Sequence, residues 1–210
     1  GTDSRAWIHA FDAAEVGANG LTLDTNGFDP AVDQDFVNAA GTLGTLVKTG
    51  AGTLSLSVTD TCVATTRVDA GALSLTPTTA DAFATRLVVT DGATFSLADG
   101  KKTDLTLPSL DISNGTLLLD ASDAIVVCGD AHLDGLSVRF AQTPETGMAQ
   151  DFLTVKGTLD EASQTAVRKT ICGNDLSEGT HARFETVRDE STGVWTIRLE
   201  VREDVEPLTA

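Results

Sequence analysis

Aromatic residues are scarce in this sequence. It contains no tyrosine, and phenylalanine and tryptophan together make up only 5 % of its 210 residues. The apolar 41 % therefore consists mainly of small and branched side chains. Such side chains suit stacked β-strands better than a packed helix bundle, so the composition favours an all-β protein.

Basic residues are also scarce: 14 lysines and arginines stand against 31 acidic residues, a formal net charge of −17. A phosphate-binding surface needs clustered positive charge, so we expect no nucleic acid as a partner. The same charge disfavours an anionic membrane surface. No apolar run approaches the ~18 residues of a membrane helix, so we expect no membrane insertion in this stretch.

The three cysteines are Cys62, Cys128 and Cys172, and no two of them have CxxC spacing. An odd number without that spacing argues against a metal site. We expect buried thiols, and one disulfide with a free thiol is the alternative.

Glutamate is almost missing from the first 150 residues, where 17 of the 19 acids are aspartate. Aspartate favours turns because its side chain hydrogen-bonds to nearby backbone. The segment is therefore expected to contain many turns between strands rather than an acidic helix.

A short motif built on glycine recurs along residues 1–150. Aligned copies begin at Gly52, Gly71, Gly92, Gly115 and Gly135, at intervals of 19, 21, 23 and 20 residues. Each glycine is followed by alternating apolar and polar residues, as in Leu54 and Leu56 or Leu73 and Leu75. This period of two indicates half-buried strands.

Two architectures use such a pattern. A stack of hairpins or a β-sandwich would explain the local turns. A parallel β-helix also explains why the whole strand-glycine-strand unit recurs about every 20 residues. We therefore predict a parallel β-helix of about five to six coils over residues 1–150, with glycines at its corners and Leu54 and Leu56 stacked on Leu73 and Leu75.

The pattern changes after residues 141–150, which contain proline, glycine and polar residues. Residues 159–173 have acids first and bases last, as expected of a short helix. Residues around 189–193 predict a hairpin loop, followed by a strand in which Trp195 packs into the core. Because a solenoid must cover its open ends, we assign 151–210 to a β-rich C-terminal cap containing one short helix.

The segment 20–76 resembles the autotransporter-associated β-strand repeat. Its first half is matched by Leu46, Lys48, Gly50, Gly52, Leu54 and Leu56, and its second half by Val68, Gly71, Leu73 and Leu75. The resemblance implies a right-handed parallel β-helix in a large bacterial surface or secreted protein. In that family the repeats are thought to aid passenger export and folding rather than catalysis. We expect the side chain of Lys48 to lie outside the coil.

Metal and histidine chemistry have little support. His9, His132 and His181 are scattered, and His132 is expected to lie in a solvated loop. No zinc-binding spacing is present. We expect no cofactor, although the aspartate-rich turns leave a structural calcium ion as an alternative, for instance near Asp29, Asp33 and Asp35.

Stacked coils offer one route to catalysis, because Asp91, Asp111 and Asp134 occupy similar positions in successive copies. A ladder of carboxylates would supply the pair that glycoside hydrolysis requires. However, like charges at such spacing repel. Lys101 and Lys102 are a weak basic partner and are expected in an exposed loop.

The sequence therefore favours a non-enzymatic structural or adhesive segment of a bacterial protein, extracellular or associated with the outer membrane. Host or extracellular-matrix glycans or glycoproteins are the expected partners, and a monomer is the expected state. The alternative is a carbohydrate-active β-helix module: a glycan-binding domain, a polysaccharide lyase or glycosidase, or its non-catalytic appendage.

Overall fold

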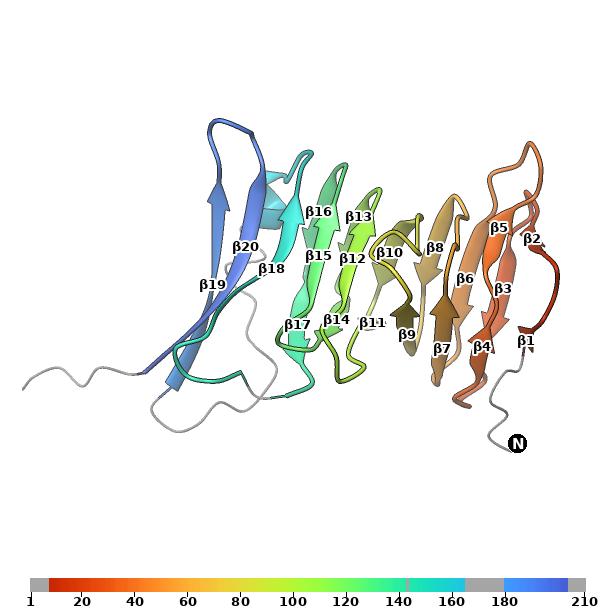
Figure 1. Ribbon diagram of the computed structural model, residues 1–210, viewed down its shortest axis with the longest axis horizontal. Coiled ribbons are helices and arrows are strands. Elements are labelled where there is room, and N and C mark those ends of the chain that lie inside the picture. The colour runs from red at the N-terminus through yellow and green to blue at the C-terminus, as the bar shows by residue number, and fades with distance from the viewer. Residues whose placement is uncertain (1–7, 143, 165–179, 204–210) are drawn as a thin grey trace, which may run out of the picture.

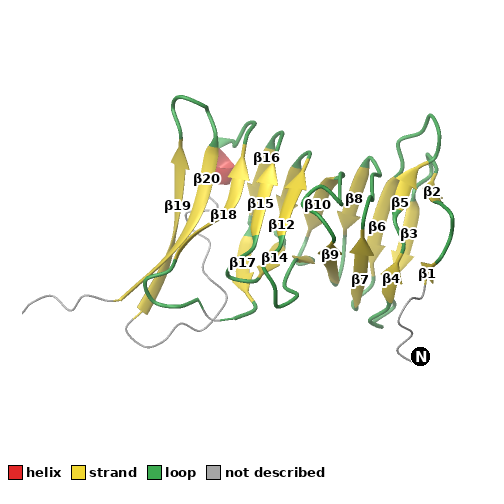
Figure 2. Ribbon diagram, viewed as in Figure 1, coloured by secondary structure: helices red, strands yellow, loops and turns green. Residues whose placement is uncertain are grey.

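The computed structural model describes residues 8–142, 144–164 and 180–203, and almost all of its regular structure is β-strand. Figure 1 shows the strands stacked side by side along the long axis, from β1 at one end to the β19–β20 hairpin at the other. In Figure 2 the strands dominate and a single helical turn, residues 161–164, lies near the hairpin end. No helix among the described residues is long and apolar enough to cross a membrane.

Parallel strands form the three faces of the solenoid. Face 1 contains β3 (Leu21–Asp24), β6 (Thr45–Thr49), β8 (Thr65–Val68), β10 (Arg86–Thr90), β13 (Leu110–Ser113) and β16 (Ala131–Asp134). Face 2 contains β1 (Ile8–His9), β4 (Ala31–Asp33), β7 (Thr53–Val58), β9 (Ala72–Pro77), β11 (Thr94–Ser96), β14 (Thr116–Leu119) and β17 (Ser137–Phe140).

Face 3 is less regular. It begins with β2 (Ala14–Val16) and β5 (Phe36–Asn38) and ends with β12 (Asp104–Leu107), β15 (Ala124–Val127) and β18 (Ala149–Val155). Between these two groups only single bridges continue the face, from Val37 to Cys62 and from Thr61 to Phe83. The chain therefore runs from face 1 to face 2 to face 3 and then begins the next coil.

The register of face 1 measures the length of each coil. Leu21, Leu46, Thr66, Leu87, Leu110 and Ala131 are successive partners, at intervals of 25, 20, 21, 23 and 21 residues. Six coils follow one another in this way. The predicted parallel β-helix of about six coils, with one short helix near its C-terminal end, is confirmed.

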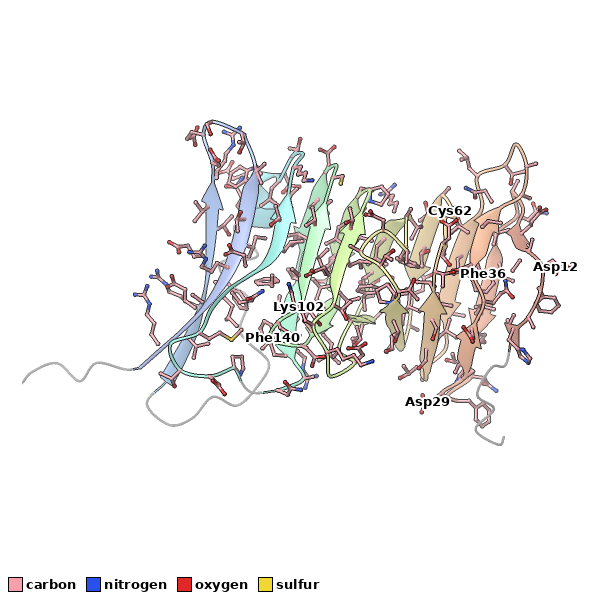
Figure 3. The ribbon with its side chains drawn as sticks, viewed as in Figure 1. Asp12, Asp29, Phe36, Cys62, Lys102 and Phe140 are labelled. Atoms are coloured by element: carbon pink, nitrogen blue, oxygen red, sulfur yellow. The ribbon has the colours of Figure 1, made fainter. Side chains whose placement is uncertain are left out.

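Columns of apolar side chains form the core. On face 2, Leu54, Leu73, Phe95, Leu117 and Val138 are register partners, and each is at most 1 % exposed. Leu56 pairs in the same way with Leu75, as predicted. Figure 3 shows Phe36 among the strands of the first coils, whereas Asp29 lies at a lower corner. Burial of each large side chain stabilises the fold by about 1.5–3 kcal/mol.

The corner between face 1 and face 2 requires glycine in coils 2 and 3. Gly50 and Gly71 have φ values of 80° and 64°, which favour glycine. A Cβ on Gly71 would lie 2.4 Å from both the Gly50 and the Gly52 carbonyl oxygens. The stretch 50–52 is therefore a coil corner stacked directly on its neighbour, as predicted.

The C-terminal cap continues face 3. β18 pairs in parallel with β15 and antiparallel with β20 (Trp195–Glu203), which pairs with β19 (Thr180–Arg188). The predicted boundary after residue 150 falls within β18. The hairpin is confirmed, and the helix predicted over 159–173 is described only at 161–164, its remainder lying outside the described residues.

Aromatic rings join the cap to the last coil. The Phe152 ring lies 6.3 Å from Phe140 and 5.5 Å from Phe184, with edge-to-face geometry in both pairs. Trp195 is partly buried against the core, as predicted, and the Arg188 guanidinium lies 5.4 Å from its ring centroid. The cap is therefore packed against the solenoid through its apolar side.

Candidate functional sites

The residues of the predicted repeat signature lie around the corner between face 1 and face 2 in coils 2 and 3. The position of one of them, Lys48, differs from the prediction. The prediction that Lys48 faces outward is wrong, because the residue is only 1 % exposed. Its register partners on face 1 are Leu23 and Val68, so its stem lies in an inward-facing apolar column. Leu46, two residues earlier, occupies the other inward column and is also buried.

The Lys48 ammonium group donates three hydrogen bonds to backbone carbonyl oxygens. Its Nζ lies 2.9 Å from Thr49 O, 2.8 Å from Gly50 O and 2.9 Å from Ala70 O. The first two acceptors belong to its own corner and the third belongs to the next coil. All three ammonium donors are therefore used, and Lys48 ties two successive corners together.

Burial lowers the pKa of Lys48 below its ordinary value, and the nearby carboxylates of Asp24 and Asp29 oppose that shift. Asp24 Oδ1 also accepts a hydrogen bond from Asn26 N at 2.8 Å, and Asp29 Oδ1 accepts one from Thr53 N at 2.7 Å. These acids hold the corner backbone of coils 1 and 2. We call Lys48 together with its three carbonyl acceptors, the backbone oxygens of Thr49, Gly50 and Ala70, the lysine clamp.

A second polar site lies on the outer side of face 1, next to the start of the cap. A groove of about 440 Å³ is lined there by charged and polar side chains, among them Arg86, Asp111, Asp130, His132, Thr158 and Asp160. β10, β13 and β16 carry the first, second and fourth of these residues. The segment after β18 supplies the last two.

Two ion pairs cross the groove. Arg86 Nη2 lies 2.8 Å from Asp111 Oδ2, and His132 Nδ1 lies 2.7 Å from Asp160 Oδ2. Asp111 and His132 are direct register partners on β13 and β16, so the two pairs are neighbours. The four side chains are between 30 % and 53 % exposed, so a ligand can reach them.

The groove is also where the cap meets coil 6. Asp160 Oδ1 accepts a hydrogen bond from Ser163 N at 2.7 Å, which caps the helical turn, and Ser163 Oγ accepts one from Leu133 N at 2.8 Å. The hydrogen bond that Asp160 accepts from His132 raises the pKa of His132. The Ser163 amide and His132 together lower the pKa of Asp160.

This arrangement places donors and acceptors beside apolar surface, to which the lining residues Leu110 and Ala131 belong. Arg86 and protonated His132 supply positive charge, while Asp111, Asp130 and Asp160 supply negative charge. A ligand with many hydroxyl groups fits such a mixture better than an apolar or strongly anionic one.

The structure does not bring Asp91, Asp111 and Asp134 into one column of carboxylates. Asp111 has Val88 and His132 as its register partners, and Asp134 stands beside Ser113. Asp91 lies in the turn after β10, with a φ of 28°. Asp111 lies four residues before the glycine of its copy, Gly115, whereas Asp91 and Asp134 directly precede Gly92 and Gly135.

The structure also places the other residues singled out in the sequence. His132 is exposed as predicted, but it lies on a strand rather than in a loop. Lys101 and Lys102 lie in an exposed loop as predicted, and Lys102 Nζ is 3.3 Å from Asp104 Oδ2. His181 lies on β19.

Two of the three acids named for a calcium ion, Asp29 and Asp35, accept hydrogen bonds from the chain itself. Asp35 accepts hydrogen bonds from the backbone of Thr59 at 2.9 Å and from the Thr61 hydroxyl at 3.0 Å. Within the described ranges, no group of three or more histidine, cysteine or acidic residues is arranged to hold a metal ion.

The cysteines differ from the prediction of buried thiols. Cys62 is half-buried, Cys128 is exposed, and both are free. Cys128 directly follows β15, in the bend after that strand of face 3. Cys172 lies outside the described residues, so a disulfide involving it stays untested.

Comparison of the chain with protein-family models, with curated proteins and with solved structures found no match in any of the three. The resemblance of residues 20–76 to the autotransporter-associated repeat therefore stays a prediction from the sequence.

Proposed function

We propose that this chain is a non-enzymatic scaffold, a structural or adhesive segment of a bacterial cell-surface or secreted protein. The observation that supports this proposal best is the stacking of six coils, in which inward columns of apolar side chains join successive coils and the lysine clamp joins coil 2 to coil 3. A solenoid of this kind holds its outer faces at fixed positions along a rod.

The surface charge suits this role. The chain carries a net charge of −17, which opposes edge-to-edge association of strands. Several outward charges are already paired, including Arg67 with Asp69 at 2.8 Å and Arg198 with Asp151 at 2.5 Å. An extracellular location, a monomeric state and host glycans or glycoproteins as partners belong to the same proposal.

A binding and turnover screen tests the scaffold. The purified chain is applied to a glycan array and to immobilised mucin, and the same glycans are incubated with it in solution and analysed for fragments. Binding without fragments is the expected result for an adhesive segment. Release of shortened or unsaturated oligosaccharides would contradict a non-enzymatic role.

A second candidate function is glycan binding at the groove beside the cap. It is favoured by the two adjacent ion pairs, whose unused donors and acceptors face an open hollow of about 440 Å³. Removal of one partner should weaken a bound saccharide by about 1–3 kcal/mol. We therefore expect Arg86→Gln to reduce binding of any glycan found in the screen by about fivefold or more.

Arg67→Gln is the matched control for that experiment. Arg67 is the register partner of Val88 on the same face, is similarly exposed and is also ion-paired, but it does not line the groove. Equal losses in Arg67→Gln and Arg86→Gln would assign the binding to general surface charge instead.

A further inference from the structure

Two carboxylates are buried in one tight turn between β14 and β15. Asp120 is 4 % exposed and Asp123 is 0 % exposed. Asp123 N donates to Asp120 O at 3.0 Å, and Asp120 N donates to Asp123 Oδ2 at 2.7 Å. Two buried acids so close in the chain cannot both ionise freely, because each charge is desolvated and each repels the other.

The same carboxylates attach coil 5 to the loop of coil 4. Asp120 Oδ2 accepts hydrogen bonds from Asp99 N at 3.0 Å and from Gly100 N at 2.6 Å. Asp123 Oδ1 accepts one from Thr103 N at 2.8 Å. Three of the four carboxylate oxygens are thus occupied by backbone donors.

The fourth oxygen, Asp120 Oδ1, is buried and has no hydrogen-bond partner. An unpaired buried carboxylate oxygen is costly, so its surroundings should supply a proton or a cation. A metal cluster of three or more side chains is missing from the described parts of the chain.

The charges around Asp120 and Asp123 favour protonation of one of the two carboxyl groups. Asp99, on the coil 4 loop, adds a further negative charge near Asp123. Lys101 and Lys102 on that loop are exposed, and Lys102 is paired with Asp104.

On the side of coil 6, a hollow of about 630 Å³ separates the turn residues Ala121 and Ser122 from a loop that carries Glu145. Among the described residues that line this hollow, Glu145 is the one with a charge, and it is acidic.

Burial raises the pKa of Asp123 to about 6, against the opposing effect of the Thr103 and Asp120 amides, and the charges of Asp120 and Asp99 add to the rise.

We propose that one of the two carboxyl groups, Asp120 or Asp123, keeps its proton in the folded chain, so that this turn carries a single buried negative charge where it joins coil 5 to coil 4. The contact between the two coils is then sensitive to pH. Loss of the proton leaves two buried negative charges in one turn.

The direction of the pH effect follows from the raised pKa. A group that holds its proton more tightly in the folded state stabilises the fold fully below its unfolded pKa, here 3.8. That contribution is lost as the pH rises through about 6. The loss corresponds to about a hundredfold decrease in the ratio of folded to unfolded protein.

Asp120→Asn provides the test. The asparagine oxygen can still accept from Asp99 N and Gly100 N, while the side chain carries no charge at any pH. Urea unfolding between pH 4.5 and pH 7.5 should therefore show a smaller loss of stability with rising pH in the variant than in the natural chain, because the charge of Asp120 no longer adds to the burial that raises the pKa of Asp123.

Asp81→Asn is the matched control, because Asp81 is an exposed acid in another turn. It should keep the pH dependence of the natural chain. Equal pH profiles for the natural chain and Asp120→Asn would overturn the proposal.

A second readout uses the natural chain alone. In a ¹³C NMR titration of the aspartate carboxyl carbons, one buried carboxyl should titrate with an apparent pKa near 6. Titration of every aspartate near 3.8 would overturn the proposal. So would a stability that responds to EDTA or added Ca²⁺, because a cation rather than a proton would then occupy the free oxygen.

Discussion

Replacement of Lys48 by methionine tests the lysine clamp. Methionine keeps most of the stem that packs between Leu23 and Val68 but removes the ammonium group. Three backbone carbonyl oxygens, now paired at 2.8–2.9 Å, lose their donor. The expected result is a less stable protein whose strands remain formed.

The magnitude follows from two opposing terms. Hydrogen bonds from a charged donor contribute about 1.5–3 kcal/mol each, so three contribute roughly 4–9 kcal/mol. Removing the ammonium group from a buried position recovers several kcal/mol of desolvation cost. We therefore expect Lys48→Met to lower the free energy of unfolding by about 2–4 kcal/mol.

The assay is urea unfolding at pH 7, followed by circular dichroism in the β-strand region. Lys101→Met is the control, because Lys101 lies in an exposed loop and its replacement should change stability by less than about 0.5 kcal/mol. If Lys48→Met is as stable as the natural chain, the three hydrogen bonds do not offset the burial of the charge. The reasoning about the clamp would then be refuted.

Three further substitutions test the corners, the groove and the cap. Gly71→Ala would place a Cβ 2.4 Å from two carbonyl oxygens of the neighbouring corner, so its melting temperature should fall well below that of Gly100→Ala, where φ is 80° but the space is open. The bond to its carboxylate partner raises the pKa of His132, so its contribution to cap docking, under about 1 kcal/mol, should be present below pH 6.5 and lost as the pH rises through the raised pKa. His132→Gln should abolish this pH dependence of cap docking, which can be measured by hydrogen exchange of the amides in the cap. Phe152→Ala removes a fully buried ring and should cost about 3–5 kcal/mol in thermal unfolding, whereas Phe28→Ala, at a site 57 % exposed, should cost little.

The coil architecture was accessible from the sequence because its two signals agree. Alternation after each glycine predicts strands, and the recurrence near 20 residues predicts that they stack in parallel. The pairing of Leu54 with Leu73 and of Leu56 with Leu75 follows from aligning the two copies. Face 3 gave no such signal, because in coils 2 and 3 it is reduced to single bridges.

The position of Lys48 was mispredicted although the sequence contains the relevant signal. Leu46 and Lys48 are two residues apart on β6, so a strand that buries one must point the other inward as well. The expectation that lysine is exposed outweighed this alternation. What the sequence does not reveal is the set of carbonyl oxygens that makes burial tolerable, because they come from two successive corners.

The groove beside the cap could not be predicted from the sequence. Arg86 and Asp111 are 25 residues apart, and His132 and Asp160 are 28 residues apart. Their contact depends on coil lengths of 23 and 21 residues and on how the cap turns back over coil 6. Aspartates are so frequent in this chain that no local motif distinguishes the ones that meet.

Cross-strand contacts measured by solution NMR test the central claim most directly, because a scaffold requires coils that stack in parallel and in register. The account predicts nuclear Overhauser effects between Leu54 and Leu73 and between Leu56 and Leu75, with the parallel pattern of amide and α-proton contacts. Close α-proton pairs between residues 45–49 and 53–57 would instead show an antiparallel hairpin around Gly50, and would contradict the solenoid.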